Sequence, residues 1–269
     1  MAITAHTATW TEEVVDAAGQ ALHLLQGGSG GPLLVLHGEM GHPGLLRFHT
    51  ALAAHYALTL PMHPGFGRTA RLEWVNNIRD LAAWYLEALD DLDVAQTAVL
   101  GCGLGGWLAA EMAAMSPRQF SKLILASAPG IRPPRGEIFD MFLVVAKEYI
   151  DRGFVAPATT PEYHQLYGAE PSPEQNETWF NAREESCRLA WRPYMHDLTL
   201  PPRLHRLKRL PTLILWGHDD AIVPVSAAQA YQEAIPGARL TILERCGHYP
   251  EIEHAEAFVQ HVHEFLQAP

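Results

Sequence analysis

The chain carries the sequence GCGLGGW at residues 101–107, between a short apolar run and a stretch with helical periodicity. A strand followed by a tight glycine-rich turn and a helix is typical of two kinds of functional site. Gly101, Gly103 and Gly106 match the dinucleotide-binding pattern G-x-G-x-x-G. Gly101 and Gly105 match the nucleophile elbow G-x-S-x-G, with Gly103 in the position of the serine.

The surrounding sequence disfavours the dinucleotide interpretation. That pattern requires the first strand–helix unit of a nucleotide-binding domain and an acidic residue about 20 positions later. Here about a hundred residues precede the turn, and the next predicted strand ends in ASAP at residues 126–129 without an acidic side chain. We therefore expect no nucleotide cofactor.

Two later motifs support the elbow interpretation. The sequence LWGHDDAIVP at residues 215–224 places carboxylates directly after a predicted strand, and CGHYPEIE at residues 246–253 places a histidine in the loop after the last predicted strand. The order is nucleophile position, acid, histidine. This is the order required by the serine-hydrolase arrangement on a parallel sheet.

With these motifs the chain resembles the α/β-hydrolase superfamily, in the branch of esterases, lactonases and carbon–carbon bond hydrolases that carry a helical cap. An HG pair at residues 37–38 and PGFG at residues 64–67 resemble two further family turns. The resemblance extends over nearly the whole chain. His63 departs from it, because relatives often carry Asp there, and no function is assigned to it.

The resemblance implies a role for each matching residue. Asp220 would be the acid that orients the histidine, and His248 the general base and acid. Asp219 is the alternative acid, and the spacing to Trp216 and Pro224 favours Asp220.

The resemblance also implies where an oxyanion would bind. The backbone N–H of Leu104 would be one donor. The second would come from Glu39 or Met40, directly after the HG turn, and the sequence leaves this choice open.

Gly103 changes the expected chemistry. A glycine has no side chain, so no acyl-enzyme forms at this position, and Cys102 would point away from the site that the elbow presents. We interpret the chain as a hydrolase of a small, largely apolar carboxylic ester or lactone that was disabled at its nucleophile. The alternatives are a carbon–carbon bond hydrolase, a ligand-binding relative, or a natural lyase-type enzyme that uses His248 and Asp220.

The predicted fold is a doubly wound, mostly parallel α/β sheet with a helical cap. We expect a core from residues 1–130 and 211–269 and a cap at residues 131–210, rich in aromatic side chains. Predicted strands cover residues 32–36, 56–60, 97–100, 122–126, 212–216 and 239–243. Predicted helices cover residues 44–55, 74–92, 104–115, 226–234 and 255–266.

The composition restricts the classes of molecule that the protein is expected to bind. The 19 basic and 30 acidic side chains give a net charge of −11, which disfavours nucleic acid and anionic membranes and leaves a small-molecule substrate. No leader or membrane span is expected, and the predicted location is cytoplasmic. Cys102, Cys187 and Cys246 are interpreted as free thiols. No metal or cofactor site is predicted, and the sequence does not indicate an oligomeric state.

Overall fold

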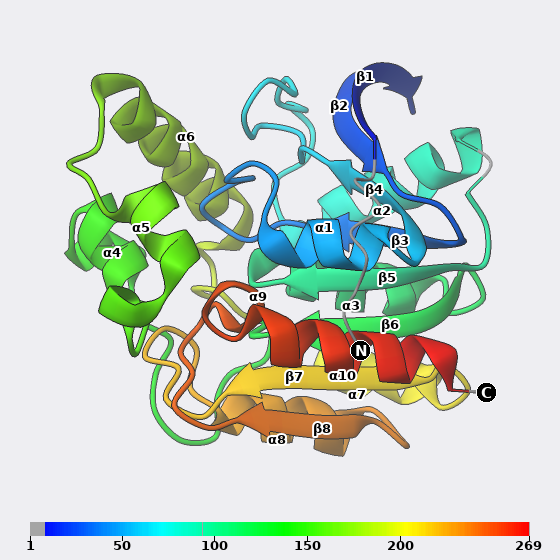
Figure 1. Ribbon diagram of the computed structural model, residues 1–269. Helices are drawn as coiled ribbons and strands as arrows, with labels where there is room; N and C mark the ends of the chain where they lie inside the picture. Colours follow the sequence, from blue (N-terminus) through cyan, green and yellow to red (C-terminus); the bar gives the residue numbers. More distant parts are fainter. Residues whose placement is uncertain (1–8, 93, 269) are drawn as a thin grey trace.

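The computed structural model describes residues 9–92 and 94–268, which form one eight-stranded sheet in the order β1-β2-β4-β3-β5-β6-β7-β8 (Figure 1). Strands β1 and β2 pair antiparallel with each other, β2 pairs antiparallel with β4, and all later neighbours are parallel. The predicted mostly parallel α/β sheet is therefore confirmed. The strands are β1 (Trp10–Ala17), β2 (Gln20–Gly27), β3 (Gly31–Leu36), β4 (Tyr56–Pro61), β5 (Thr97–Cys102), β6 (Phe120–Ala126), β7 (Thr212–Gly217) and β8 (Arg239–Leu243).

The antiparallel hairpin of β1 and β2 was not predicted from the sequence. Strand β1 lies at the edge of the sheet, and five of its eight residues are exposed. An edge strand that buries little apolar surface lacks the continuous hydrophobic run that identified the central strands.

Helices cover both faces of the sheet (Figure 1). One core cluster packs beneath α2, α3 and α8, and the other beneath α1 and α10. Helix α2 begins later than predicted because the Asn77 side chain caps it by accepting the Asp80 N–H. The helices are α1 (Arg47–Ala53), α2 (Ile78–Asp91), α3 (Leu104–Met115), α4 (Ala146–Arg152), α5 (Pro161–Tyr167), α6 (Pro173–Ala190), α7 (Pro201–Leu204), α8 (Ser226–Ala234), α9 (Pro250–Glu253) and α10 (Ala255–Gln267).

The connection from β6 to β7 is helical and contains α4 to α7. Helices α4, α5 and α6 lie at the end of the sheet toward which the arrowheads of β5, β7 and β8 point (Figure 1). Tyr149 and Trp179 of this connection are buried in the two core clusters, whereas Phe142 and Trp191 stay half-exposed with their rings 5.8 Å apart. The carboxyl ends of the parallel strands, where ligands bind in open α/β sheets, thus face this connection.

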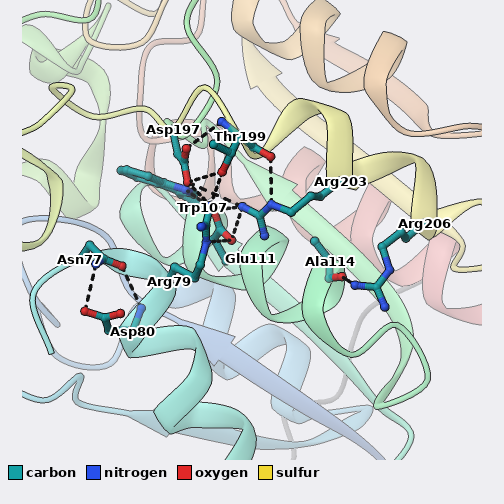
Figure 2. Close-up of polar contacts among 10 residues, drawn as sticks. All are labelled: Asn77, Arg79, Asp80, Trp107, Glu111, Ala114, Asp197, Thr199, Arg203 and Arg206. Carbon is teal, nitrogen blue, oxygen red and sulfur yellow. Dashed lines mark hydrogen bonds and ion pairs between the residues drawn. The ribbon is translucent and has the colours of Figure 1, made fainter.

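An ion-pair network centred on one buried carboxylate ties α3 to the end of the same connection (Figure 2). Glu111 of α3 is fully buried and pairs with Arg203 at 2.8 Å and with Arg79 of α2 at 3.7 Å. Trp107 Nε1 donates to the same carboxylate at 3.4 Å, and Arg79 also pairs with Asp197. The network fixes the helix that follows the glycine-rich turn against two other segments.

Candidate active site

The turn at residues 101–107 has the geometry of a sharp strand-to-helix elbow. Gly103 lies between β5 and α3 with φ 50° and ψ −126°, in a region that favours glycine. Its N–H donates to the Ala126 carbonyl at 2.9 Å, and its carbonyl accepts the Gly106 N–H at 2.8 Å. A Cβ at Gly105 would overlap the backbone of Leu36 and His37, so this turn packs directly against the end of β3.

The side chain of Glu39 occupies the space in front of Gly103. A Cβ added at Gly103 would overlap Oε2 of Glu39. This oxygen accepts the N–H of Leu104 at 3.3 Å, and Oε1 accepts the Tyr149 hydroxyl at 3.0 Å. The carboxylate is 1% exposed. The carboxylate therefore occupies the position of a side chain at residue 103. It also binds the backbone N–H that was predicted to stabilise an oxyanion.

His248 and Asp220 form a buried pair. His248 Nδ1 lies 2.9 Å from Asp220 Oδ2, while Asp220 Oδ1 accepts the N–H groups of Ile222 and Val223 at 2.9 and 2.8 Å. The backbone N–H of His248 donates to Gly153 at 2.6 Å. These bonds hold the imidazole and leave its Nε2 facing the elbow.

Asp219 lies elsewhere. Its side chain is 45% exposed and contacts His218 at 3.0 Å instead of His248. Of the two neighbouring carboxylates, only Asp220 points into the site.

The imidazole of His248 bridges two carboxylates, because its Nε2 lies 3.3 Å from Glu39 Oε1. Burial alone would lower the pKa of His248, but Asp220 and Glu39 outweigh it and raise the pKa above its ordinary value. Burial alone would raise the pKa of Glu39, yet His248 outweighs this and lowers the pKa to about 2. At neutral pH the site therefore holds an imidazolium beside the ionised carboxylate of Glu39.

The turn that carries Glu39 rests on buried neutral imidazoles. The backbone N–H of His63 donates to His37 Nε2 at 3.1 Å, and His63 Nδ1 lies 2.6 Å from the Tyr85 hydroxyl. Burial lowers the pKa of His63 to about 3. The Ser186 hydroxyl donates to the Glu39 carbonyl at 2.8 Å. His63 thus supports the HG turn from below, a role that the sequence did not reveal.

A mostly apolar pocket opens beside Glu39, Gly103 and His248. Its wall continues through α9, α5 and the loop that follows β3. Cys102 also lines it, and burial raises the pKa of this thiol well above its ordinary value, so Cys102 stays protonated and is a poor nucleophile. The apolar part of the lining comes from Val35, Leu36, Met40, Leu46, Phe48 and Ile252.

The structure brings four of the predicted site residues together: Gly103, Leu104, Asp220 and His248. Met40 lines the pocket as well. Glu39 was considered only for its backbone N–H, and its side chain is the feature that sequence reasoning missed. The roles predicted for all these residues remain predictions.

The profile of the alpha/beta hydrolase family matches residues 33–261, which is most of the chain. The chain belongs to the alpha/beta hydrolase family. Among curated relatives of this alpha/beta hydrolase is 2-hydroxymuconate semialdehyde hydrolase of Pseudomonas sp. (strain CF600), 26% identical over 94% of this chain and 92% of the relative. The 2-hydroxy-6-oxononadienedioate/2-hydroxy-6-oxononatrienedioate hydrolase of Burkholderia vietnamiensis (strain G4 / LMG 22486) is 27% identical, over 97% and 96%.

Solved structures show the same fold. The 2-hydroxy-6-oxo-6-phenylhexa-2,4-dienoate hydrolase of Rhodococcus sp. strain RHA1 superimposes with a TM-score of 0.77 at 21% identity, covering 97% of this alpha/beta hydrolase and all of that chain. A bacterial membrane phospholipase A superimposes with a TM-score of 0.72 at 26% identity, over 96% and 86%.

Within residues 9–92 and 94–268 of this alpha/beta hydrolase, no helix is long and apolar enough to cross a membrane. In the same described part of the chain, His, Cys, Asp and Glu side chains form no group of three or more that could hold a metal ion. The three cysteines are free thiols.

Proposed function

We propose that this alpha/beta hydrolase catalyses proton transfer next to the carbonyl group of a small, largely apolar compound, with His248 as proton donor and Glu39 as proton acceptor. Asp220 orients the imidazole. The observation that carries the proposal is the position of Glu39 Oε2, which fills the space of a nucleophile at residue 103 and accepts the Leu104 N–H.

The same carboxylate argues against acyl transfer. Acyl transfer develops negative charge on an oxygen that backbone N–H groups must stabilise. Here the Leu104 N–H already binds an ionised carboxylate, and a second negative oxygen beside it would be repelled. A chain that lacks the nucleophile and also blocks its oxyanion donor is suited to another reaction.

Proton transfer uses the charges already in the site. A substrate carbonyl that enters between His248 and Glu39 takes over the hydrogen bond of Nε2. The charge of His248 is what holds the pKa of Glu39 down against its burial, so separating the pair makes the carboxylate a stronger base. Substrate binding thus activates the proton acceptor.

The step balances without a co-reactant. Glu39 takes a proton from the carbon beside the carbonyl, and His248 gives its proton to the carbonyl oxygen, which forms a neutral enol. The reverse transfers return both protons, either to the same carbon or to another carbon of a conjugated substrate. The outcome is proton exchange or isomerisation, without a covalent intermediate.

Glu39 also bears on the origin of Gly103. A serine placed at residue 103 with Glu39 unchanged would have no room for its Cβ. The overlapping atom is the end of a flexible side chain, which fills the space beside a glycine whether or not a serine preceded it. The proposed proton transfer takes Gly103 and Glu39 as a native pair, which corresponds to the natural lyase-type alternative.

A disabled ester, lactone or carbon–carbon bond hydrolase remains the second candidate. It is favoured by the intact Asp220–His248 pair at 2.9 Å and by relatives that are themselves named as hydrolases. On this hypothesis a serine restored at residue 103 would recover turnover.

We also infer that the β6–β7 connection, residues 131–210, acts as a cap over the site. Two of its side chains support this inference. Tyr149 of α4 donates to Glu39, and Tyr167 of α5 lines the pocket. The cap would exclude water from the proton-transfer step.

The decisive experiment follows proton exchange of cyclohexanone and 2,5-hexanedione by NMR in D2O. We expect the unmodified protein to accelerate exchange. Glu39→Gln keeps the shape of the side chain, and its exchange rate should be at least about 100-fold lower. Glu256→Gln changes an exposed carboxylate on α10 and is the matched control. Equal rates in the unmodified protein and Glu39→Gln would contradict the proposal.

A second set of variants separates the two candidates. Gly103→Ser and Gly103→Ser/Glu39→Ala are assayed on p-nitrophenyl butyrate and small lactones, with mass spectrometry for an adduct on the serine. Gly103→Ser alone should form no adduct, because Glu39 occupies its space. Rapid turnover and an adduct in that single variant would support the disabled hydrolase instead.

A further inference from the structure

Three residues that line the pocket each carry a buried polar atom without a hydrogen-bond partner within the described part of the chain. These atoms are His42 Nε2, Tyr249 Oη and Glu251 Oε2. Leaving a buried polar group unpaired costs about 1–3 kcal/mol, so such groups are normally paired with protein, water or ligand. Because the three residues line one pocket, a ligand with matching polar atoms is one partner that could satisfy them.

The tautomer of His42 follows from its other bond. The Gly44 N–H donates to His42 Nδ1 at 3.1 Å, so this nitrogen carries no proton. Burial lowers the pKa of His42 to about 4, which keeps the ring neutral with its proton on Nε2. The unpaired Nε2 is therefore a hydrogen-bond donor.

Tyr249 provides a second donor. Burial raises the pKa of its hydroxyl well above the ordinary value, so the group keeps its proton. Its ring packs against Phe154 at 4.9 Å and against His248 at 5.1 Å, measured between ring centroids. The packing fixes where the hydroxyl points.

Glu251 is the third group, at the start of α9 and 7% exposed. Burial raises the pKa of its carboxyl, with smaller contributions from Glu39 and Glu162, while its own backbone N–H and His248 oppose the increase, and the resulting pKa is about 7. Tyr167, Tyr249 and Cys102 also face it and stay neutral. Below neutral pH, Glu251 is a protonated carboxyl that offers a further O–H donor.

The charge around these donors restricts the ligand. Among the described residues that line the pocket there is no Arg or Lys. The cation of His248 is already offset by Asp220 and Glu39. A ligand carboxylate would meet the acidic side chains of Glu39 and Glu251 and no free cation among the described lining residues. The cost of removing it from water would then be uncompensated.

We infer that the pocket binds a neutral ligand with a second carbonyl or ether oxygen, which accepts hydrogen bonds from donors of the set His42, Tyr249 and Glu251, and that it rejects the matching carboxylate. The inference rests on the proposed function for the first carbonyl, the one placed at Glu39 and His248. It names the substrate class as neutral compounds with two oxygen functions.

The test compares two compounds of nearly equal shape, 2,5-hexanedione and levulinate, in which one methyl group is replaced by a carboxylate oxygen. Their dissociation constants are measured by ligand-observed NMR at pH 6. We expect 2,5-hexanedione to bind at least about 10-fold more tightly than levulinate. Equal or tighter binding of levulinate, or no binding of 2,5-hexanedione, would overturn the inference.

Variants identify the donors. Tyr249→Phe removes one hydroxyl and should weaken 2,5-hexanedione binding by about 3- to 10-fold. We expect the unmodified protein to lose affinity for 2,5-hexanedione between pH 6 and pH 8, as Glu251 gives up its proton. Glu251→Gln keeps an N–H donor at every pH and should abolish this loss. Glu256→Gln is the exposed control. Unchanged affinity in Tyr249→Phe together with an unchanged pH dependence in Glu251→Gln would contradict the assignment.

These measurements need no turnover, so the two proposals fail separately. Selective binding of 2,5-hexanedione without proton exchange would overturn the proposed function and support the ligand class. Proton exchange that depends on Glu39, combined with equal binding of levulinate and 2,5-hexanedione, would support the proposed function and overturn the ligand class.

Discussion

Oε2 of Glu39 lies where the side chain of residue 103 would begin, and it accepts the N–H of Leu104 at 3.3 Å. The missing side chain at the elbow and the carboxylate that fills its place come from segments more than sixty residues apart. The Glu39 carboxylate is therefore the centre of the site, where Tyr149 and His248 also contact it.

The first prediction is an energetic coupling between these two positions. Gly103→Ala should destabilise the protein by about 1–2 kcal/mol through its positive φ alone, and by more through overlap with Glu39. In a Glu39→Ala background the overlap is absent, so the same substitution should cost less, with a coupling of about 0.5–3 kcal/mol. Urea unfolding of the four proteins measures this cycle, and additive costs would show that the two residues do not compete for space.

The second prediction concerns acid stability. The folded-state pKa of Glu39 is about 2, below its ordinary value of 4.5. A depressed carboxyl pKa contributes stability above pH 4.5 that is lost as pH falls toward 2. The free-energy gap between the unmodified protein and Glu39→Gln should therefore shrink across that window. Urea unfolding between pH 2 and pH 6 tests it, and a gap independent of pH would be inconsistent with an ionised Glu39.

His248 acts in the opposite direction, because its folded-state pKa is raised above 6.5. Its stabilising contribution is complete below pH 6.5 and is lost as pH rises through the raised value. The third prediction is that His248→Gln loses less stability relative to the unmodified protein at high pH than at pH 6. The NMR titration of the His248 ring reports the same charge directly, and an ordinary pKa would contradict the ion pair with Glu39.

Much of the fold was predictable from the sequence. The central strands were found because strands buried on both faces are continuous apolar runs, and the motifs around Asp220 and His248 placed both residues in loops after strands. Strand β1 was missed because an exposed edge strand has no such run. In the β6–β7 connection, the sequence indicated helices but not which aromatic side chains reach the site.

The arrangement of Glu39 could not be derived in the same way. The sequence indicated that the backbone after the HG turn lies near the elbow, and the family pattern drew attention to its N–H group. Whether the side chain also turns inward depends on free space at residue 103 and on partners such as Tyr149, which is distant in the sequence. The available signal was the joint occurrence of a glycine at the elbow and an acidic residue after the HG turn.

A fourth prediction concerns nucleotides, because the glycine pattern of the elbow also fits a dinucleotide site. The N–H of Leu104 at the start of α3 binds the Glu39 carboxylate, so a pyrophosphate there would face a negative charge in place of a free helix terminus. NAD at about 1 mM should leave the melting temperature unchanged. A saturable increase would reopen the nucleotide interpretation.

The fifth prediction concerns the ion-pair network beneath the elbow. Glu111 is fully buried and pairs with Arg203 at 2.8 Å, so Glu111→Ala would leave the partly buried Arg203 with Asp197, at 3.7 Å, as its only ionic partner among the described residues. It would also remove the acceptor of the Trp107 N–H. We expect a loss of about 1–3 kcal/mol in the free energy of unfolding.

Glu111→Met/Arg203→Met is the informative comparison, because replacing both partners by apolar groups of similar volume leaves fewer charges unpaired and should be less destabilising than Glu111→Ala. Arg79 also contacts Glu111, at 3.7 Å, but it keeps Asp197 as a partner. A double variant as unstable as Glu111→Ala would mean that packing around Trp107, rather than charge pairing, sets the stability of this region.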